Sequence, residues 1–191
     1  QALLESTVVK FLVFSDLDEP LHFDNIAPGA WDRLVSLQIN HCGKGVSFSE
    51  RLASLPGLQT IDLDHLRIVR LPKGPWPALK DLSITYSSLA EPLPDHILDL
   101  PTIESIDLTN TSVAALGMQS ISRVKEGQLQ GIRRLALMNN SVTAVPEGLE
   151  ALPSLTELSL AGCPISSFPT TSRDAFPALV HLKLHFCTAL H

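Results

Sequence analysis

The sequence has few cysteines, few methionines and no excess of basic residues. Three widely separated cysteines in 191 residues do not form the even set of a disulfide framework. Its 14 basic residues are outnumbered by 20 acidic ones, for a net charge of −6, so nucleic acid is not the expected partner. No stretch approaches the roughly 18 uninterrupted apolar residues of a membrane span, so we expect no membrane insertion by this segment.

Motifs of known catalytic chemistry are also missing. The patterns H-E-x-x-H, G-x-S-x-G and C-x-x-C do not occur, and neither does a calcium-binding loop. Residues 43–45 read G-K-G, but they lack the glycine spacing and the following Ser or Thr of a phosphate-binding loop. We therefore expect no enzymatic activity, no catalytic residue, no cofactor and no metal ion.

Leucine is the residue in excess, with 33 leucines in 191 residues, and it recurs at a fixed spacing. Residues 155–165 read L-x-x-L-x-L-x-x-C-x-I, and the same frame fits eight times. The units start at Val9, Leu34, Leu58, Leu79, Ile103, Ile132, Leu155 and Leu179. This periodicity predicts a single repeat array over residues 1–191. Because neither end carries a capping repeat, we expect a section of a longer solenoid.

The pattern inside each unit indicates its local structure. The alternation L-x-L predicts a short strand whose fourth and sixth residues point into the core. Pairs such as Leu71-Pro72 and Val145-Pro146 follow, and proline cannot continue a hydrogen-bonded ladder. Only the unit that starts at Ile103 has room for a longer helix, over residues 117–126. We predict an α/β solenoid, with a parallel sheet on its concave side and mostly irregular or 3₁₀ segments on its convex side.

The ninth position of each unit lies where the chain turns away from the strand. Polar side chains there are expected to bond backbone groups of neighbouring turns that would otherwise be buried unpaired. We assign this ladder role to Cys42, Ser87, Thr111, Asn140, Cys163 and Cys187. Leu17 and Leu66 break the pattern. Since all three cysteines lie in this column, we expect free, inert thiols.

On these eight in-frame copies, the chain resembles the leucine-rich repeat family over nearly its whole length. The resemblance implies a horseshoe that recognises a protein or peptide ligand on its concave strand face, without catalysis. The mean step of about 24 residues is similar to that of cell-surface receptor ectodomains. Residues 176–187 instead resemble the cysteine-bearing repeats of plant intracellular nucleotide-binding immune receptors. We favour an extracellular or cell-surface receptor, signalling or adhesion protein, with the cytoplasm as the alternative location.

The strand face implied by the frame changes the sign of its charge along the array. Units three to five carry five acidic side chains there against the single cation Lys80, whereas units six and eight are basic. Such a surface suits the orientation of a protein partner, although solvated strands also carry polar residues. The candidate partner-binding residues are Asp62, Asp64, His65, Asp81, Tyr86, Glu104, Asp107, Arg133, Arg134, His181, Lys183, His185 and Phe186.

Two further features concern histidine and asparagine. His41 and His65 share a column in adjacent units, about 5 Å apart, so a metal ion or a pH-sensitive pair is the alternative to two solvated side chains. His181 and His185 lie roughly 13 Å apart along one strand and cannot share an ion. Sequons at Asn110 and Asn139 would be exposed glycosylation sites in a secreted chain.

Two other functions remain open for such a solenoid. It could be a structural spacer or assembly scaffold within a larger complex. It could also be the substrate-selecting repeat domain of an enzyme whose catalytic part lies outside residues 1–191. The repeat pattern establishes the scaffold and does not by itself decide among these functions.

Overall fold

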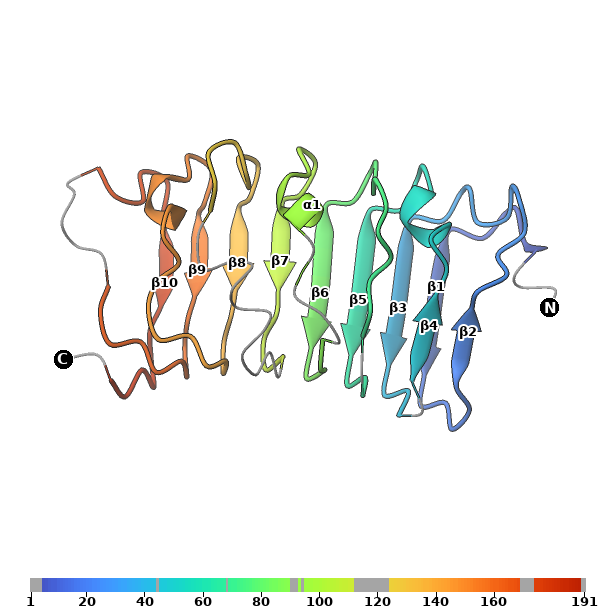
Figure 1. The fold of residues 1–191 in the computed structure, drawn as a ribbon, viewed down its shortest axis with the longest axis horizontal. Helices are drawn as coiled ribbons and strands as arrows, with labels where there is room; N and C mark the ends of the chain where they lie inside the picture. The colour runs from blue at the N-terminus through green and yellow to red at the C-terminus, as the bar shows by residue number, and fades with distance from the viewer. Residues whose placement is uncertain are drawn as a thin grey trace.

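The chain winds into a parallel β-solenoid, in which successive turns add strands to one common sheet (Figure 1). The computed structural model describes residues 5–43, 45–67, 69–89, 93, 95–111, 124–168 and 174–189. In order, the strands of the eight-stranded sheet are β1 (Phe11–Ser15), β3 (Ser36–Asn40), β5 (Thr60–Asp64), β6 (Asp81–Thr85), β7 (Ser105–Asp107), β8 (Arg134–Ala136), β9 (Glu157–Ser159) and β10 (His181–Lys183). Each begins two residues after the start of a sequence unit. The predicted solenoid and repeat architecture is confirmed.

One face of this sheet packs against the connecting segments and forms the core. In β3, Leu37 and Ile39 are fully buried, and register pairs Leu37 with Ile61 of β5. Burying each such side chain contributes roughly 1.5–3 kcal/mol, so the stacked rows hold the turns together. In β10, by contrast, Leu182 is 41% exposed, because no described turn covers the far side of this strand.

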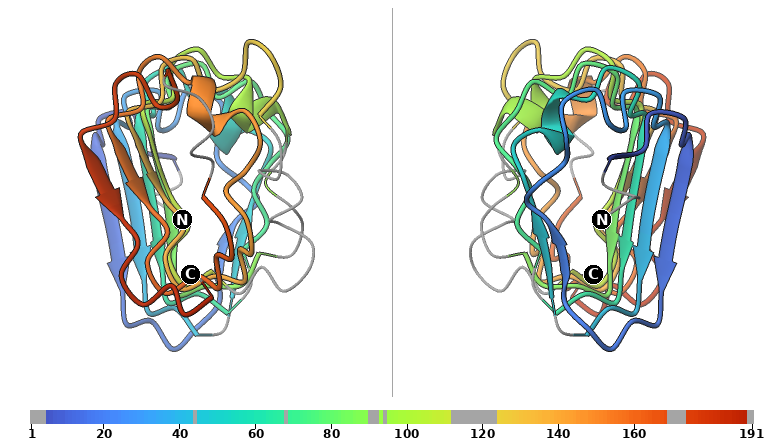
Figure 2. Two further views of the ribbon diagram at one scale, coloured as in Figure 1. Left: turned by 90° about the vertical axis from the view of Figure 1, so that its left-hand side faces the viewer. Right: turned by 90° about the vertical axis from the view of Figure 1, so that its right-hand side faces the viewer.

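The connecting segments lie on the opposite side of the solenoid (Figure 2). They comprise a second, two-stranded parallel sheet of β2 (Leu21–Phe23) and β4 (Val46–Phe48), the 3₁₀ turns η2 (Leu52–Ser54) and η4 (Leu149–Ala151), and the helix α1 (Asp95–Leu98). The second sheet is not predicted by the sequence, because its strands β2 and β4 lie in the first two units and no pattern repeated through the array marks them. The described residues contain a single α-helix, of four residues, so this part of the chain is a β-solenoid. The α/β character that the sequence predicted is not seen there.

The longer helix expected over residues 117–126 falls mainly outside the described residues. Its described part, residues 124–126, contains no helix and leads into a turn. Among the described residues, no helix reaches the length and apolarity that a membrane crossing requires.

The eighth residue of every unit adopts a left-handed backbone conformation, with φ between 47° and 72°. These residues are Asp16, His41, His65, Tyr86, Asn110, Asn139, Gly162 and Phe186. The conformation suits Gly and Asn but strains bulky residues by about 1–2 kcal/mol. In the first seven units, the N–H of this residue donates to a carbonyl of the next turn at 2.7–3.1 Å, which extends the ladder by one bond. That bond offsets part of the strain.

Candidate functional site

The outer face of the eight-stranded sheet points away from the core and from the connecting segments (Figure 2). The end strands stand further out than the middle strands in both end-on views, so this face is concave along the solenoid (Figure 2). The fifth residue of each unit forms its central row. In order, this row comprises Val13, Gln38, Asp62, Ser83, Asp107, Ala136, Ser159 and Lys183.

Ion pairs between turns connect the acidic and basic parts of the outer face. Arg134 of β8 reaches Asp81 of β6 at 3.5 Å and thereby spans β7. The others are Arg133–Glu104 at 3.7 Å, Lys80–Glu104 at 3.8 Å and Lys183–Glu157 at 2.6 Å. Each exposed pair contributes at most about 1 kcal/mol. The separate acidic and basic segments inferred from sequence are therefore partly joined, because long side chains reach across one or two strands.

Asp62 and Asp107 take part in none of these pairs. No cation of the described residues lies within ion-pair distance of either carboxylate. Burial raises the pKa of the Asp62 carboxyl; a hydrogen bond with Ser83 opposes the rise, and the charges of Asp64 and Asp107 add to it. Asp107 accepts a hydrogen bond from the Thr109 N–H at 2.8 Å. The centre of the outer face thus holds acidic charge without a cationic partner in the described part of the chain.

A hollow opens on the outer face beside Asp107. Its polar rim includes Asp107, Arg134, Glu157, Ser159 and Lys183, and its apolar part includes Met138. Ser159 is 2% exposed, and its hydroxyl oxygen lacks a hydrogen-bond partner among the described residues. A hollow with both charges and a buried free hydroxyl can accept a polar side chain of a ligand.

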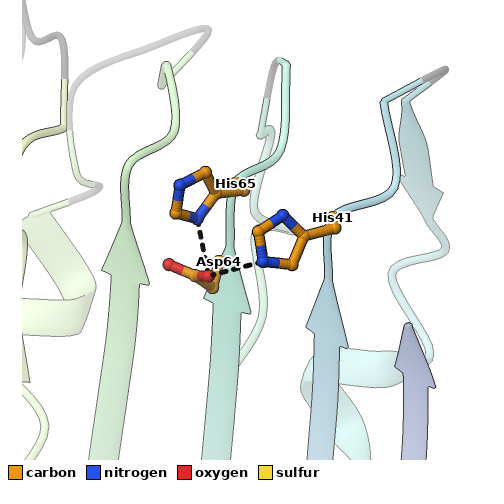
Figure 3. A group of neighbouring side chains, drawn as sticks. All are labelled: His41, Asp64 and His65. Carbon is orange, nitrogen blue, oxygen red and sulfur yellow. Dashed lines mark hydrogen bonds and ion pairs between the residues drawn. The ribbon is translucent and has the colours of Figure 1, made fainter. Parts of the chain in front are cut away.

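A histidine cluster, defined as His41, Asp64 and His65, lies at the ends of β3 and β5 (Figure 3). His65 Nδ1 lies 2.7 Å from Asp64 Oδ2, and His41 Nε2 lies 3.8 Å from the same oxygen. Thr85 Oγ1 donates to the other oxygen, Asp64 Oδ1, at 2.6 Å. The His65 ring stacks on His41 and on Tyr86, with centroids 4.4 and 4.7 Å apart.

The electrostatics of this cluster favour an ionised carboxylate. Partial burial opposes ionisation of Asp64, but hydrogen bonds from Thr85 and His65 and the charges of His65 and His41 outweigh it. The pKa of Asp64 therefore lies below its usual value. The repeat frame predicts the two histidines side by side, and it predicts Asp64 only as a residue that contacts the partner. The strand register could have identified Asp64 as the third member of the cluster, because it pairs Asp64 with Asn40, the neighbour of His41.

The remaining candidate residues are dispersed. His181 and His185 lie at the last strand, and the His185 ring meets Phe186 edge-on at 5.2 Å. Phe186 is 81% exposed. Asn110 and Asn139 are exposed at the eighth position of their units.

Ladder residues bond backbone groups of the preceding unit. Thr111 donates to the Ile84 carbonyl at 2.6 Å, and Asn140 donates to the Leu108 carbonyl at 2.7 Å. Cys163 and Cys187 donate to the equivalent carbonyls of Leu137 and Leu160 at 3.0 and 3.3 Å, and Ser87 accepts from the Leu66 N–H at 2.9 Å. Cys42, by contrast, donates to the Asn40 carbonyl of its own turn, at 3.5 Å. All three cysteines are free thiols.

Comparison with known proteins identifies no relative. A scan against protein-family models gives no match, and a search of curated proteins finds no similar sequence.

Proposed function

We propose that the chain is a leucine-rich repeat array of the horseshoe type, and that it recognises a protein or peptide partner on its concave outer face without catalysis. Three observations support the family. Parallel strands recur at the same place in eight units, the fourth and sixth residues of the middle units are buried in the core, and the ninth residues of the last five units bond the preceding turn.

The observation that carries the binding role is the pair Asp62 and Asp107 in the central row. The structure keeps two half-buried carboxylates there, and burial makes the charged form of Asp62 unfavourable. Such a group costs the isolated chain stability at neutral pH, and a role in binding would explain why it is present. A partner that places two Lys or Arg residues against these strands would neutralise both charges, so we propose a basic segment as the ligand.

Neighbouring side chains would fix the orientation of that segment. Arg133 and Arg134 stand on one side of Asp107, so an acidic residue of the ligand would be accommodated there. Tyr86, which is 48% exposed, offers an aromatic surface on the other side. Aromatic residues and arginine are enriched in the energetically important parts of interfaces.

Affinity capture from native extract with the double variant Asp62→Asn and Asp107→Asn tests this proposal. Both substitutions preserve side-chain shape, so the fold should survive while capture of the partner falls at least tenfold. The matched control is Asp18→Asn with Glu126→Gln, which removes the same charge from exposed loop positions. If both double variants capture the same proteins equally well, the proposed site is wrong.

The other functions make different predictions for the same experiment. A spacer or assembly scaffold would retain its neighbours in both variants. A substrate-selecting domain would lose a substrate in the variant that carries both Asp62→Asn and Asp107→Asn. In that case the full-length transcript would also encode a catalytic domain. We propose a location at the cell surface or outside the cell, where the exposed sequon residues Asn110 and Asn139 would be open to glycosylation. Glycans on these residues would support that location, and their absence from the native protein would favour the cytoplasm.

A further inference from the structure

The histidine cluster combines three donor groups on two adjacent turns. The chain enters the left-handed conformation at His41 (φ 54°) and again at His65 (φ 51°), so both side chains leave the sheet at the same point of successive turns. Asp64 precedes His65 as the last residue of β5. As a result, one ligand atom from each residue lies within 4.8 Å of the others (Figure 3).

From this geometry we propose that His41, Asp64 and His65 form a binding site for a divalent transition-metal cation of the zinc type. Tetrahedral coordination with bonds of about 2.0–2.2 Å requires donor atoms about 3.3 Å apart. Asp64 Oδ2 lies 2.7 Å from His65 Nδ1 and 3.8 Å from His41 Nε2, on either side of this value. Rotation of the two partly exposed imidazoles would bring all three donors to one cation.

The carboxylate is already oriented for this role. Thr85 holds Oδ1 of Asp64 by a hydrogen bond at 2.6 Å, which leaves Oδ2 directed at the two imidazoles. Tyr86 covers the other face of the His65 ring, with an interplanar angle of 14°. Partners of this kind, which hold a ligand in position, commonly affect metal affinity tenfold to a hundredfold.

The donor types select the class of cation. Two imidazole nitrogens and one carboxylate oxygen suit Zn²⁺, Cu²⁺, Ni²⁺ or Co²⁺, whereas Ca²⁺ and Mg²⁺ prefer sets of oxygen ligands. Cys42, one residue after His41, is fully buried and contacts the Asn40 carbonyl, so no thiolate joins the set. Three protein ligands on an exposed surface leave a further coordination position for water or for a side chain of another molecule.

Calorimetric titration of the chelator-treated chain with Zn²⁺ tests the proposal directly. We expect one equivalent to bind with a dissociation constant on the order of 10 µM or tighter. Co²⁺ should produce the absorption of a site with nitrogen and oxygen ligands and no thiolate charge-transfer band. The variants His41→Phe and His65→Phe keep a ring in the stack, at a position where Phe186 already adopts the same conformation. Each should weaken binding at least tenfold, and so should Asp64→Asn.

The matched control is His22→Phe. His22 lies 3.7 Å from Asp24, so it forms a pair of imidazole and carboxylate without a second imidazole. This variant should bind Zn²⁺ as the unmodified chain does, and circular dichroism should show that all variants are folded. Equal binding by the His65→Phe and His22→Phe variants, a thiolate band with Co²⁺, or no binding would each overturn the proposal. The outcome is independent of the partner experiment, because Asp62 and Asp107 do not belong to the cluster.

Discussion

The eighth residue of each unit decides where the chain leaves the outer sheet. Its positive φ turns the backbone away from the strand direction, while in the first seven units its N–H still donates to the next turn. Asn110 and Asn139 adopt this conformation readily, but His41 and Tyr86 do so at a steric cost. Strained backbone that the surrounding structure maintains is common at binding sites, and here it brings the histidine cluster together.

Asp62→Asn should increase the stability of the isolated chain at neutral pH. The folded pKa of Asp62 is raised by burial, so the ionised carboxyl costs stability above that pKa, and the cost disappears as the group becomes protonated. The gain from the amide should therefore shrink as the pH falls through the carboxyl range. Urea unfolding at pH 7 and near pH 4 measures this difference.

The control for this prediction is Asp18→Asn, at an exposed loop position. It should change the unfolding free energy by no more than about 0.5 kcal/mol at either pH. A loss of stability in the Asp62→Asn variant at pH 7 would show that the carboxylate is favourably placed, and the argument for a basic ligand would lose its basis.

At the scale of the element, the ladder ties each strand to the turn before it. Asn140 is 8% exposed, and its Nδ2 donates to the carbonyls of Leu108 and Leu137 at 2.7 and 3.0 Å. Asn140→Leu should lower the unfolding free energy by about 1–3 kcal/mol, because buried carbonyls lose their donor. The exposed neighbour Ser141 offers the control Ser141→Ala, with an expected change within about 0.5 kcal/mol. Urea unfolding midpoints that coincide for the two variants would contradict this role.

Elements with strong periodicity could be predicted from the sequence, and the others could not. Leu37, Ile61 and Leu82 recur in one frame, so the strands and their buried faces follow from spacing alone. Strand β2 pairs only with β4, and two such strands give no pattern that repeats along the array. Trp31 and Trp76 adopt a positive φ that their residue type does not suggest.

Only part of the candidate site could likewise be predicted from the sequence. The columns of His41 and His65 follow from the frame, because residues at equal positions of adjacent units lie side by side. The bond of Asp64 to Thr85 and the reach of Arg134 across β7 depend on side-chain rotamers, which no spacing rule specifies.

Seen as a whole molecule, the solenoid has contacts mainly between adjacent turns. Each middle strand of the large sheet has two neighbours, whereas β1 and β10 have one each, and the three residues of β10 are all exposed. Amide hydrogens of β10 should therefore exchange at least about tenfold faster than those of β6. A tenfold ratio corresponds to a free energy of local opening that is lower by about 1.4 kcal/mol in β10. Hydrogen exchange followed by mass spectrometry measures both segments together. Equal protection would indicate that all turns open as one cooperative unit.

The parallel stacking of the turns also determines how the chain would respond to mechanical load. Successive strands of the large sheet begin on average about 24 residues apart. A fully extended residue spans about 3.3–3.6 Å, so each turn peeled from an end would release roughly 80 Å of chain. Pulled from its two ends, the protein would lengthen in repeated steps of similar size and act as an extensible tether whose remaining turns keep their shape.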